Sequence, residues 1–165
     1  MLHRLEIYQT GEWHIVGEWD PYPLPKPPGI FQNFRSTIYE LQADCALVDP
    51  DGRAILAYRG RQFNGMSVPR PFRIFLDPMG QGGRASTFHD IGYEDGFISV
   101  YDSRGLCVQA DKPMPKAYFD RAFRAAMALA PYTVTPWLRR VIYGAVVVGG
   151  WPAWLKHRRK DNKTI

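Results

Sequence analysis

The chain has 165 residues, of which 45% are hydrophobic, enough for one buried core without disulfides or metal. Its formal net charge of +5 comes mainly from the last eleven residues, where five lysines and arginines stand against one aspartate. A basic end on a nearly neutral body differs from the patterned basic face of a nucleic-acid-binding protein, so we do not expect nucleic acid as a partner.

The residue totals also indicate the compartment and the number of domains. Cys45 and Cys107 are 62 residues apart and neither stands in a Cys-x-x-Cys pattern, so we interpret both as buried or semi-buried thiols rather than as a disulfide. The first residues alternate in polarity and carry charges throughout, which argues against a secretory signal peptide. We therefore expect folding in a reducing cytoplasm, as a single domain over residues 1–155 with a basic, flexible tail over residues 156–165.

The first predicted elements are strands. Residues 3–9 and 12–19 alternate around a Thr-Gly turn, which predicts an opening hairpin. Residues 20–29, DPYPLPKPPG, contain five prolines, so neither a helix nor a central strand can continue through them. We expect this proline-rich arm to be an extended connector, and a proline-rich ligand motif is the alternative.

A second hairpin is predicted where residues 37–49 and 53–59 flank the turn sequence PDG. Residues 66–77 form another extended stretch, which two prolines interrupt. A glycine-rich loop, DPMGQGGR at residues 77–84, follows. The first half of the chain is therefore predicted to be mainly antiparallel β-structure.

The second half changes to a helical period. From Lys116 the apolar residues recur at intervals of three and four, which predicts an amphipathic helix over residues 116–130. Another helix is expected to begin near Pro136 and to continue through Trp154, and a shorter one to span about residues 85–95. The fold class is therefore α+β, an antiparallel β portion followed by about three helices.

The late apolar run, residues 141–154, has no charged residue. As a helix it would be about 21 Å long, short of the ~30 Å hydrocarbon core of a bilayer, so we do not expect it to cross a membrane. Two interpretations stay open. The run is a core helix, or residues 137–160 make peripheral membrane contact through tryptophans at headgroup depth and basic residues on anionic lipid.

The segment RASTFHDIGYEDG, residues 84–96, carries the most chemistry. On a helix, His89 shares a face with Ala85, Gly92 and Tyr93, whereas Asp90 points about 100° further round. The two neighbours therefore serve different purposes. His89 is a candidate general base, provided that a carboxylate from another element orients its ring.

Asp120 on the predicted helix 116–130 can be that carboxylate, if the two helices pack antiparallel. Asp90 would then be free to bind calcium together with carbonyl oxygens of residues 77–84, a site of hard oxygen ligands. In this hypothesis His89 activates a water and the cation stabilises an oxyanion. The alternative is a histidine hydrogen-bonded within the core, with Asp90 as a helix cap or salt-bridge partner.

Three blocks in order resemble an uncharacterised bacteriophage and prophage family, a domain of unknown function. The blocks are VPxxF from Val68, ASxxHDxxY from Ala85 and DRxFxxAM from Asp120. The family's first block continues to an aspartate where this chain has Phe75, and the nearest acid is Asp77. The resemblance implies a phage-encoded protein that is made in the host cytoplasm and that meets phage structural proteins, as part of the virion, or a host envelope component.

The HDxxY motif is also similar to the catalytic core of secreted and parvoviral phospholipases A2. That similarity implies a hydrolase in which His89 is the base, Asp90 binds calcium and Asp120 orients His89. Asp111 is the rival for the last role, and Tyr93 and Ser86 are further candidates within the motif. A non-catalytic virion structural or assembly protein remains the alternative, so the sequence leaves open whether the protein is an enzyme.

Overall fold

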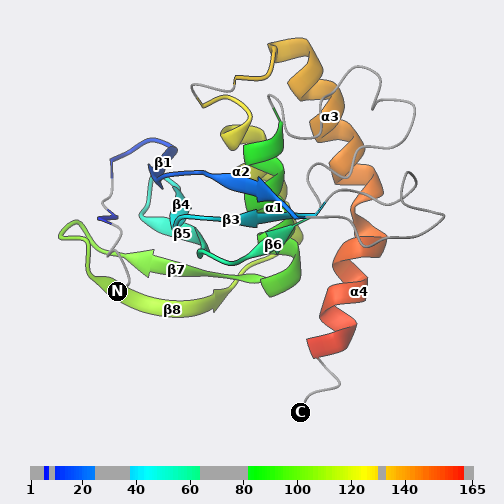
Figure 1. The fold of residues 1–165 in the computed structure, drawn as a ribbon. Helices are drawn as coiled ribbons and strands as arrows, with labels where there is room; N and C mark the ends of the chain where they lie inside the picture. The colour runs from blue at the N-terminus through cyan, green and yellow to red at the C-terminus, as the bar shows by residue number, and fades with distance from the viewer. Residues whose placement is uncertain (1–5, 8–9, 25–37, 64–81, 130–132, 162–165) are drawn as a thin grey trace.

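The computed structural model describes residues 6–7, 10–24, 38–63, 82–129 and 133–161 (Figure 1). Within these ranges eight strands and four helices are present, and the predicted α+β class is confirmed. The strands are β1 (His14–Gly17), β2 (Pro21–Pro23), β3 (Tyr39–Leu41), β4 (Cys45–Val48), β5 (Arg53–Ala57), β6 (Gln62–Phe63), β7 (Phe97–Tyr101) and β8 (Cys107–Pro113). The helices are α1 (Gly83–Asp95), α2 (Lys116–Ala126), α3 (Pro136–Gly149) and α4 (Trp151–Asp161).

The strands form two antiparallel sheets. The larger has the order β1-β4-β5-β7-β8, and the smaller has the order β2-β3-β6. The predicted hairpin around PDG is β4–β5, in which Cys45 pairs with Ala57 and Val48 with Ala54. Strand β1 pairs with β4, and most of residues 3–9, its predicted partner, lie outside the described residues.

The described part of the proline-rich arm forms β2, at the edge of the smaller sheet. An edge strand needs hydrogen-bond donors on one side only, so prolines are tolerated there. Residues 25–29 of the arm, the extended stretch 66–77 and residues 77–81 of the glycine-rich loop lie outside the described residues, and so does Asp77.

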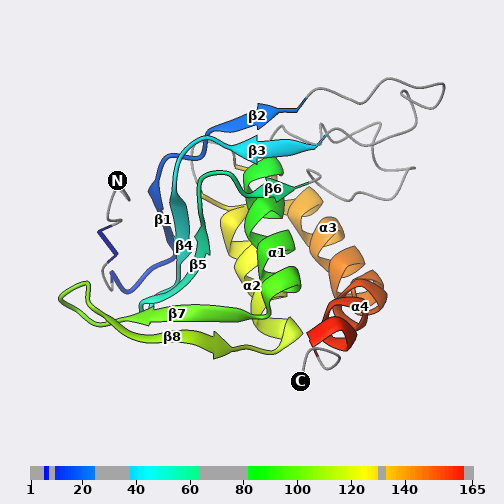
Figure 2. The same ribbon diagram turned by 60° about the horizontal axis from the view of Figure 1, so that its bottom comes forward.

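The core lies on both faces of the larger sheet. Strand β4 is buried throughout: Cys45 and Leu47 face the main core with the helices, while Ala46 and Val48 belong to a smaller cluster with Ile7. Figure 2 shows α1 and α2 beside the sheet, with α3 and α4 on the far side of that helix pair. Both cysteines are free thiols and Cys45 is buried as predicted, but Cys107 is exposed, because it lies on the edge strand β8.

Helices α1 and α2 pack antiparallel. Gly92 lies against the ring of Phe119, His89 against that of Phe123, and Arg84 donates a hydrogen bond to the carbonyl oxygen of Leu129. Positions that come later in α1 therefore face positions that come earlier in α2. The absence of a side chain at Gly92 allows this close approach, because a Cβ there would lie 2.7 Å from Cε1 of Phe119.

Residues 156–161, which form part of the predicted basic tail, belong to helix α4. Arg158 attaches this part of α4 to the carboxyl end of α1. Its guanidinium donates hydrogen bonds to the carbonyl oxygens of Tyr93, Glu94 and Asp95. Those carbonyls have no partner within the helix and carry partial negative charge, so a cation stabilises them. The long helix predicted from Pro136 is divided, since α3 ends at Gly149 and α4 starts at Trp151.

Helix α3 is not a buried core helix. Ile142 is its one buried residue, while Leu138, Tyr143 and Val146 are half-buried against the core. The opposite side of α3 carries exposed apolar side chains. In the part of the chain that the structure describes, no helix is long and apolar enough to span a membrane.

Asp49, in the turn between β4 and β5, is expected to contribute measurably to the stability of the fold. Asp49 is fully buried; its carboxylate accepts hydrogen bonds from the Arg53 side chain and from the Tyr118 hydroxyl on α2. Asp49→Ala is expected to lower the free energy of unfolding by about 2 kcal/mol, the value typical of hydrogen bonds to charged groups. Asp51→Ala in the same turn should change it by less than about 0.5 kcal/mol, because that carboxylate is exposed. Urea unfolding gives both values, and equal effects would contradict the assignment.

Candidate active site

His89 lies on α1 at the seam with α2. Its side chain is 11% exposed, and its ring is 4.0 Å from the Tyr93 ring and 4.9 Å from the Phe123 ring, measured between centroids. Tyr93 is one turn along the same helix, and Phe123 comes from the opposite helix. Aromatic rings on two sides therefore fix the plane of the imidazole.

Asp120 on α2 is the carboxylate that faces this ring. His89 Nε2 lies 3.5 Å from Asp120 Oδ1, within ion-pair distance, although the two atoms do not meet hydrogen-bond geometry. The Tyr93 hydroxyl donates a hydrogen bond of 2.6 Å to the same Oδ1. The side chain of Asp120 is only 4% exposed, so these groups form a cluster that is shielded from water.

Lys116 completes the cluster and was not predicted from the sequence. Its ammonium lies 2.7 Å from Asp120 Oδ2, and its side chain is 5% exposed. The ammonium also donates hydrogen bonds to the carbonyl oxygens of Val146 and Val147 near the end of α3. The spacing of four residues between Lys116 and Asp120 was the available signal, since such pairs face each other on a helix.

The pKa shifts within the cluster favour a negatively charged Asp120 and a positively charged His89. Burial lowers the pKa of His89, but the carboxylates of Asp120 and Asp90 outweigh burial, and the pKa is raised above its ordinary value. Burial raises the pKa of Asp120, and contacts with His89, Lys116 and Tyr93 reverse this, so its pKa is lowered. Burial and the neighbouring Asp120 raise the pKa of the Tyr93 hydroxyl, which stays protonated as a donor. The stable state therefore has Asp120 ionised and His89 readily protonated.

Asp90 lies on the other side of the imidazole, with its Oδ1 at 3.7 Å from His89 Nδ1. Its side chain is 26% exposed, more than those of Asp120 and Lys116. The two ring nitrogens thus face different carboxylates, a sealed one at Nε2 and a more open one at Nδ1. This arrangement leaves Nδ1 as the nitrogen nearer to solvent.

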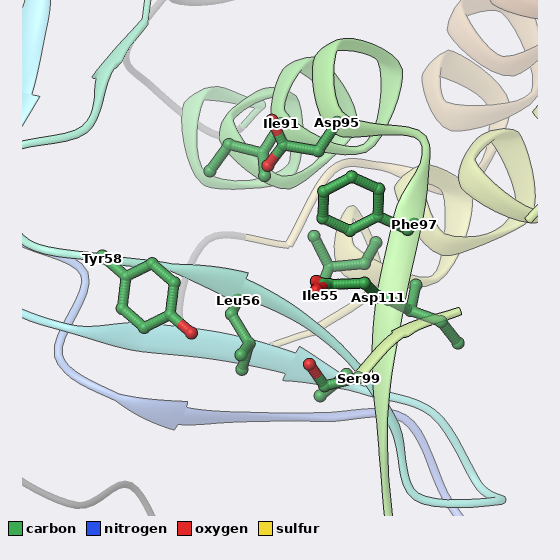
Figure 3. A pocket seen from close by; sticks show the side chains of 10 residues that line it. Ile55, Leu56, Tyr58, Ile91, Asp95, Phe97, Ser99 and Asp111 are labelled. Atoms are coloured by element: carbon green, nitrogen blue, oxygen red, sulfur yellow. The ribbon is translucent and has the colours of Figure 1, made fainter. Parts of the chain in front are cut away.

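The other predicted site residues lie apart from this cluster or beside it. Ser86 is buried, and its hydroxyl donates a hydrogen bond to the carbonyl oxygen of Gly83 within α1. Asp111 is exposed on β8 and lines a small pocket between α1, β5, β7 and β8, together with Tyr58 and Ser99 (Figure 3). His89 does not line that pocket, so Asp111 is not placed as its partner.

The described residues supply little of the predicted calcium site. Among them, no group of three histidines, cysteines or acids is arranged to hold a metal ion. The carbonyl oxygens of Gly82 and Gly83 accept hydrogen bonds within the first turns of α1, so they do not turn toward a cation. Asp90 is therefore the described candidate ligand, and residues 77–81 lie outside the described part.

Fold and site together define a small α+β protein with a histidine–carboxylate cluster between two antiparallel helices. A family model described as a protein of unknown function (DUF1353) matches residues 39–146, more than half of the chain. The chain therefore belongs to this family. The matched range includes the whole cluster of His89, Asp90, Lys116 and Asp120. No curated protein and no solved structure matches the chain.

The raised pKa of His89 predicts a pH-dependent stability. Because the folded pKa exceeds the ordinary value of 6.5, protonated His89 stabilises the fold fully below that pH, and this stabilisation is lost as the pH rises through the folded pKa. The difference in unfolding free energy between the wild type and His89→Gln should therefore shrink between pH ~5.5 and ~8.5. Urea titrations at several pH values measure it. His14→Gln is the control, because that ring lies 2.9 Å from the Thr10 hydroxyl rather than beside a carboxylate. A difference that grows with pH would refute the assignment.

Proposed function

We propose that the protein is a small phage- or prophage-encoded hydrolase that cleaves an ester in a lipid or another component of the host envelope. His89 is the general base, and Asp120 orients its ring. The observation that carries the proposal is the ring's placement: Nε2 faces the sealed Asp120 carboxylate and Nδ1 faces the more open side at Asp90. A buried carboxylate behind one nitrogen and a more exposed carboxylate beside the other suit an acid–base histidine.

The reaction needs only water as co-substrate. Neutral His89 accepts a proton from a water at Nδ1, and the water oxygen bonds to the ester carbonyl carbon. The bond from that carbon to the alcohol oxygen then breaks, and His89 returns the proton to the alcohol oxygen. Asp120 stabilises the transient imidazolium, while Tyr93 and Lys116 keep that carboxylate ionised and in position.

Calcium enters the proposal only through Asp90. A bound cation would supply positive charge for the oxyanion that forms on the ester carbonyl. The described residues contribute a single carboxylate, whereas calcium takes about 6–8 oxygen ligands. No step above depends on the cation, and its requirement is a separate arm of the experiment.

A second candidate is a non-catalytic virion or assembly protein that meets phage structural proteins. The buried Lys116–Asp120 pair favours it, because a sealed ion pair between two helices and the end of α3 serves packing as well as chemistry. In this case His89 would tie helix to helix without reacting. The two candidate functions differ in the expected effect of replacing His89, which removes hydrolysis in the first and only a packing contact in the second.

The test is hydrolysis of phospholipid and simple ester substrates by the wild type, His89→Gln and Asp120→Asn, with and without a calcium chelator. We expect His89→Gln to lose at least ~10²-fold in rate, the usual contribution of a general base, with its fold retained by circular dichroism. His14→Gln is the matched control. Rates that are indifferent to His89 and Asp120 would rule out the hydrolase. Co-purification with phage particles, together with a wild type that hydrolyses none of these substrates, would establish the structural candidate.

A further inference from the structure

One side of α3 is apolar, and no other described residue covers it. Trp137, Val141, Gly144 and Val148 follow one another at intervals of four, three and four residues, which aligns them on a single side of a helix. Trp137 is 66% exposed and Val148 is 79% exposed. The opposite side holds Ile142 and packs on the core, so this row points away from the protein.

Helix α4 also carries exposed apolar side chains. Trp151 and Leu155 are both exposed and stand one helical turn apart. Figure 1 shows α4 following α3 along one side of the molecule, and Figure 2 shows both helices on the side away from the larger sheet. We call the exposed side chains of Trp137, Val141, Val148, Trp151 and Leu155 the α3–α4 apolar face.

The charged side chains of the segment that carries this face have one sign. Residues 121–160 contain eight lysines and arginines, and all sixteen acidic residues of the chain lie outside that segment. Arg121, Arg124, Arg140, Lys156 and Arg159 are exposed. A partner for this surface must therefore offer an apolar layer next to negative charge.

We propose that the α3–α4 apolar face docks on the surface of an anionic phospholipid bilayer, with the helices lying in the plane of the membrane. The tryptophans occupy the headgroup region and the basic side chains contact lipid phosphates. The described helices are too short to cross a bilayer, which matches a peripheral contact. This docking is independent of the proposed hydrolysis, because it needs neither His89 nor Asp120.

The test is co-sedimentation of the full chain with vesicles of dialkyl ether phospholipids, which contain no carboxylic ester of the kind that the proposed reaction cleaves. We expect binding to vesicles with phosphatidylglycerol headgroups, weaker binding to phosphatidylcholine alone, and loss of binding as salt rises. Val148→Asp should lower the partition coefficient about tenfold. Val108→Asp is the matched control, because Val108 on β8 is 61% exposed outside the face, and it should bind as the wild type does.

Three results would overturn the proposal. The first is a wild-type chain that fails to bind anionic vesicles at low salt. The second is an equal loss for Val148→Asp and Val108→Asp. The third is a dimer in analytical ultracentrifugation that Val148→Asp dissociates while vesicle binding is absent, which would assign the face to a second copy of the chain. Circular dichroism confirms that each variant is folded.

Discussion

Asp120→Ala is expected to lower the free energy of unfolding by about 3–5 kcal/mol, the usual cost of removing one partner of a buried ion pair. The substitution leaves the Lys116 ammonium without its anion in a position that is 5% exposed. Two carbonyl oxygens of α3 still accept its hydrogen bonds, but they carry no net charge. The Tyr93 hydroxyl also loses its acceptor. Urea unfolding at neutral pH measures the change.

A double-mutant cycle separates this charge effect from lost packing. Lys116→Met combined with Asp120→Ala removes both charges, so the double variant should be more stable than the sum of the single changes predicts by at least ~1 kcal/mol. Strictly additive changes would show that the pair is not coupled. The exposed pair of Arg104 and Asp102 is the matched control, where a surface pair should show coupling below about 1 kcal/mol.

Gly92→Val is expected to destabilise the protein by about 3 kcal/mol, at the upper end of overpacking effects. A Cβ at Gly92 would overlap the ring of Phe119, which is fully buried and cannot move aside. The measurement is the midpoint of urea unfolding, compared between variants whose transitions have the same dependence of unfolding free energy on urea concentration. Gly144→Val on α3 is the control with the opposite sign, since nothing lies within 4 Å of its Cβ and glycine is the poorer helix former. Destabilisation of both variants to the same extent would contradict the close packing of α1 on α2.

The strongly patterned elements could be predicted from the sequence. Apolar spacing predicted the helix from Lys116, and the PDG turn predicted the hairpin β4–β5. The hairpin β7–β8 could not be predicted in this way. Most residues of β8 are exposed, because it is the edge strand of the larger sheet, and an exposed edge leaves no alternation of apolar and polar residues.

The pairing of His89 with Asp120 could be predicted from the sequence, but the further residues of the site could not. Helical geometry separated His89 from Asp90, and antiparallel packing of α1 and α2 placed Asp120 beside the ring. Lys116 was missed because its ammonium is enclosed by groups far away in the sequence, the Tyr93 ring on α1, the Trp151 ring on α4 and two carbonyl oxygens on α3. Arg158 falls in the predicted flexible tail for the same reason: its acceptors at the end of α1 are close to it in space but far from it in sequence.

The labelling rate of the buried Cys45 thiol measures how often the fold opens. Burial, with a smaller contribution from Asp44, raises the pKa of Cys45 to about 12, so its reactive thiolate is rare in the native state. Cys107 is exposed and accepts a thiol label without unfolding. After Cys107 is blocked, the rate at which Cys45 reacts reports how often β4 leaves the core. That rate would distinguish local motions at the edge of the sheet from opening of the whole domain.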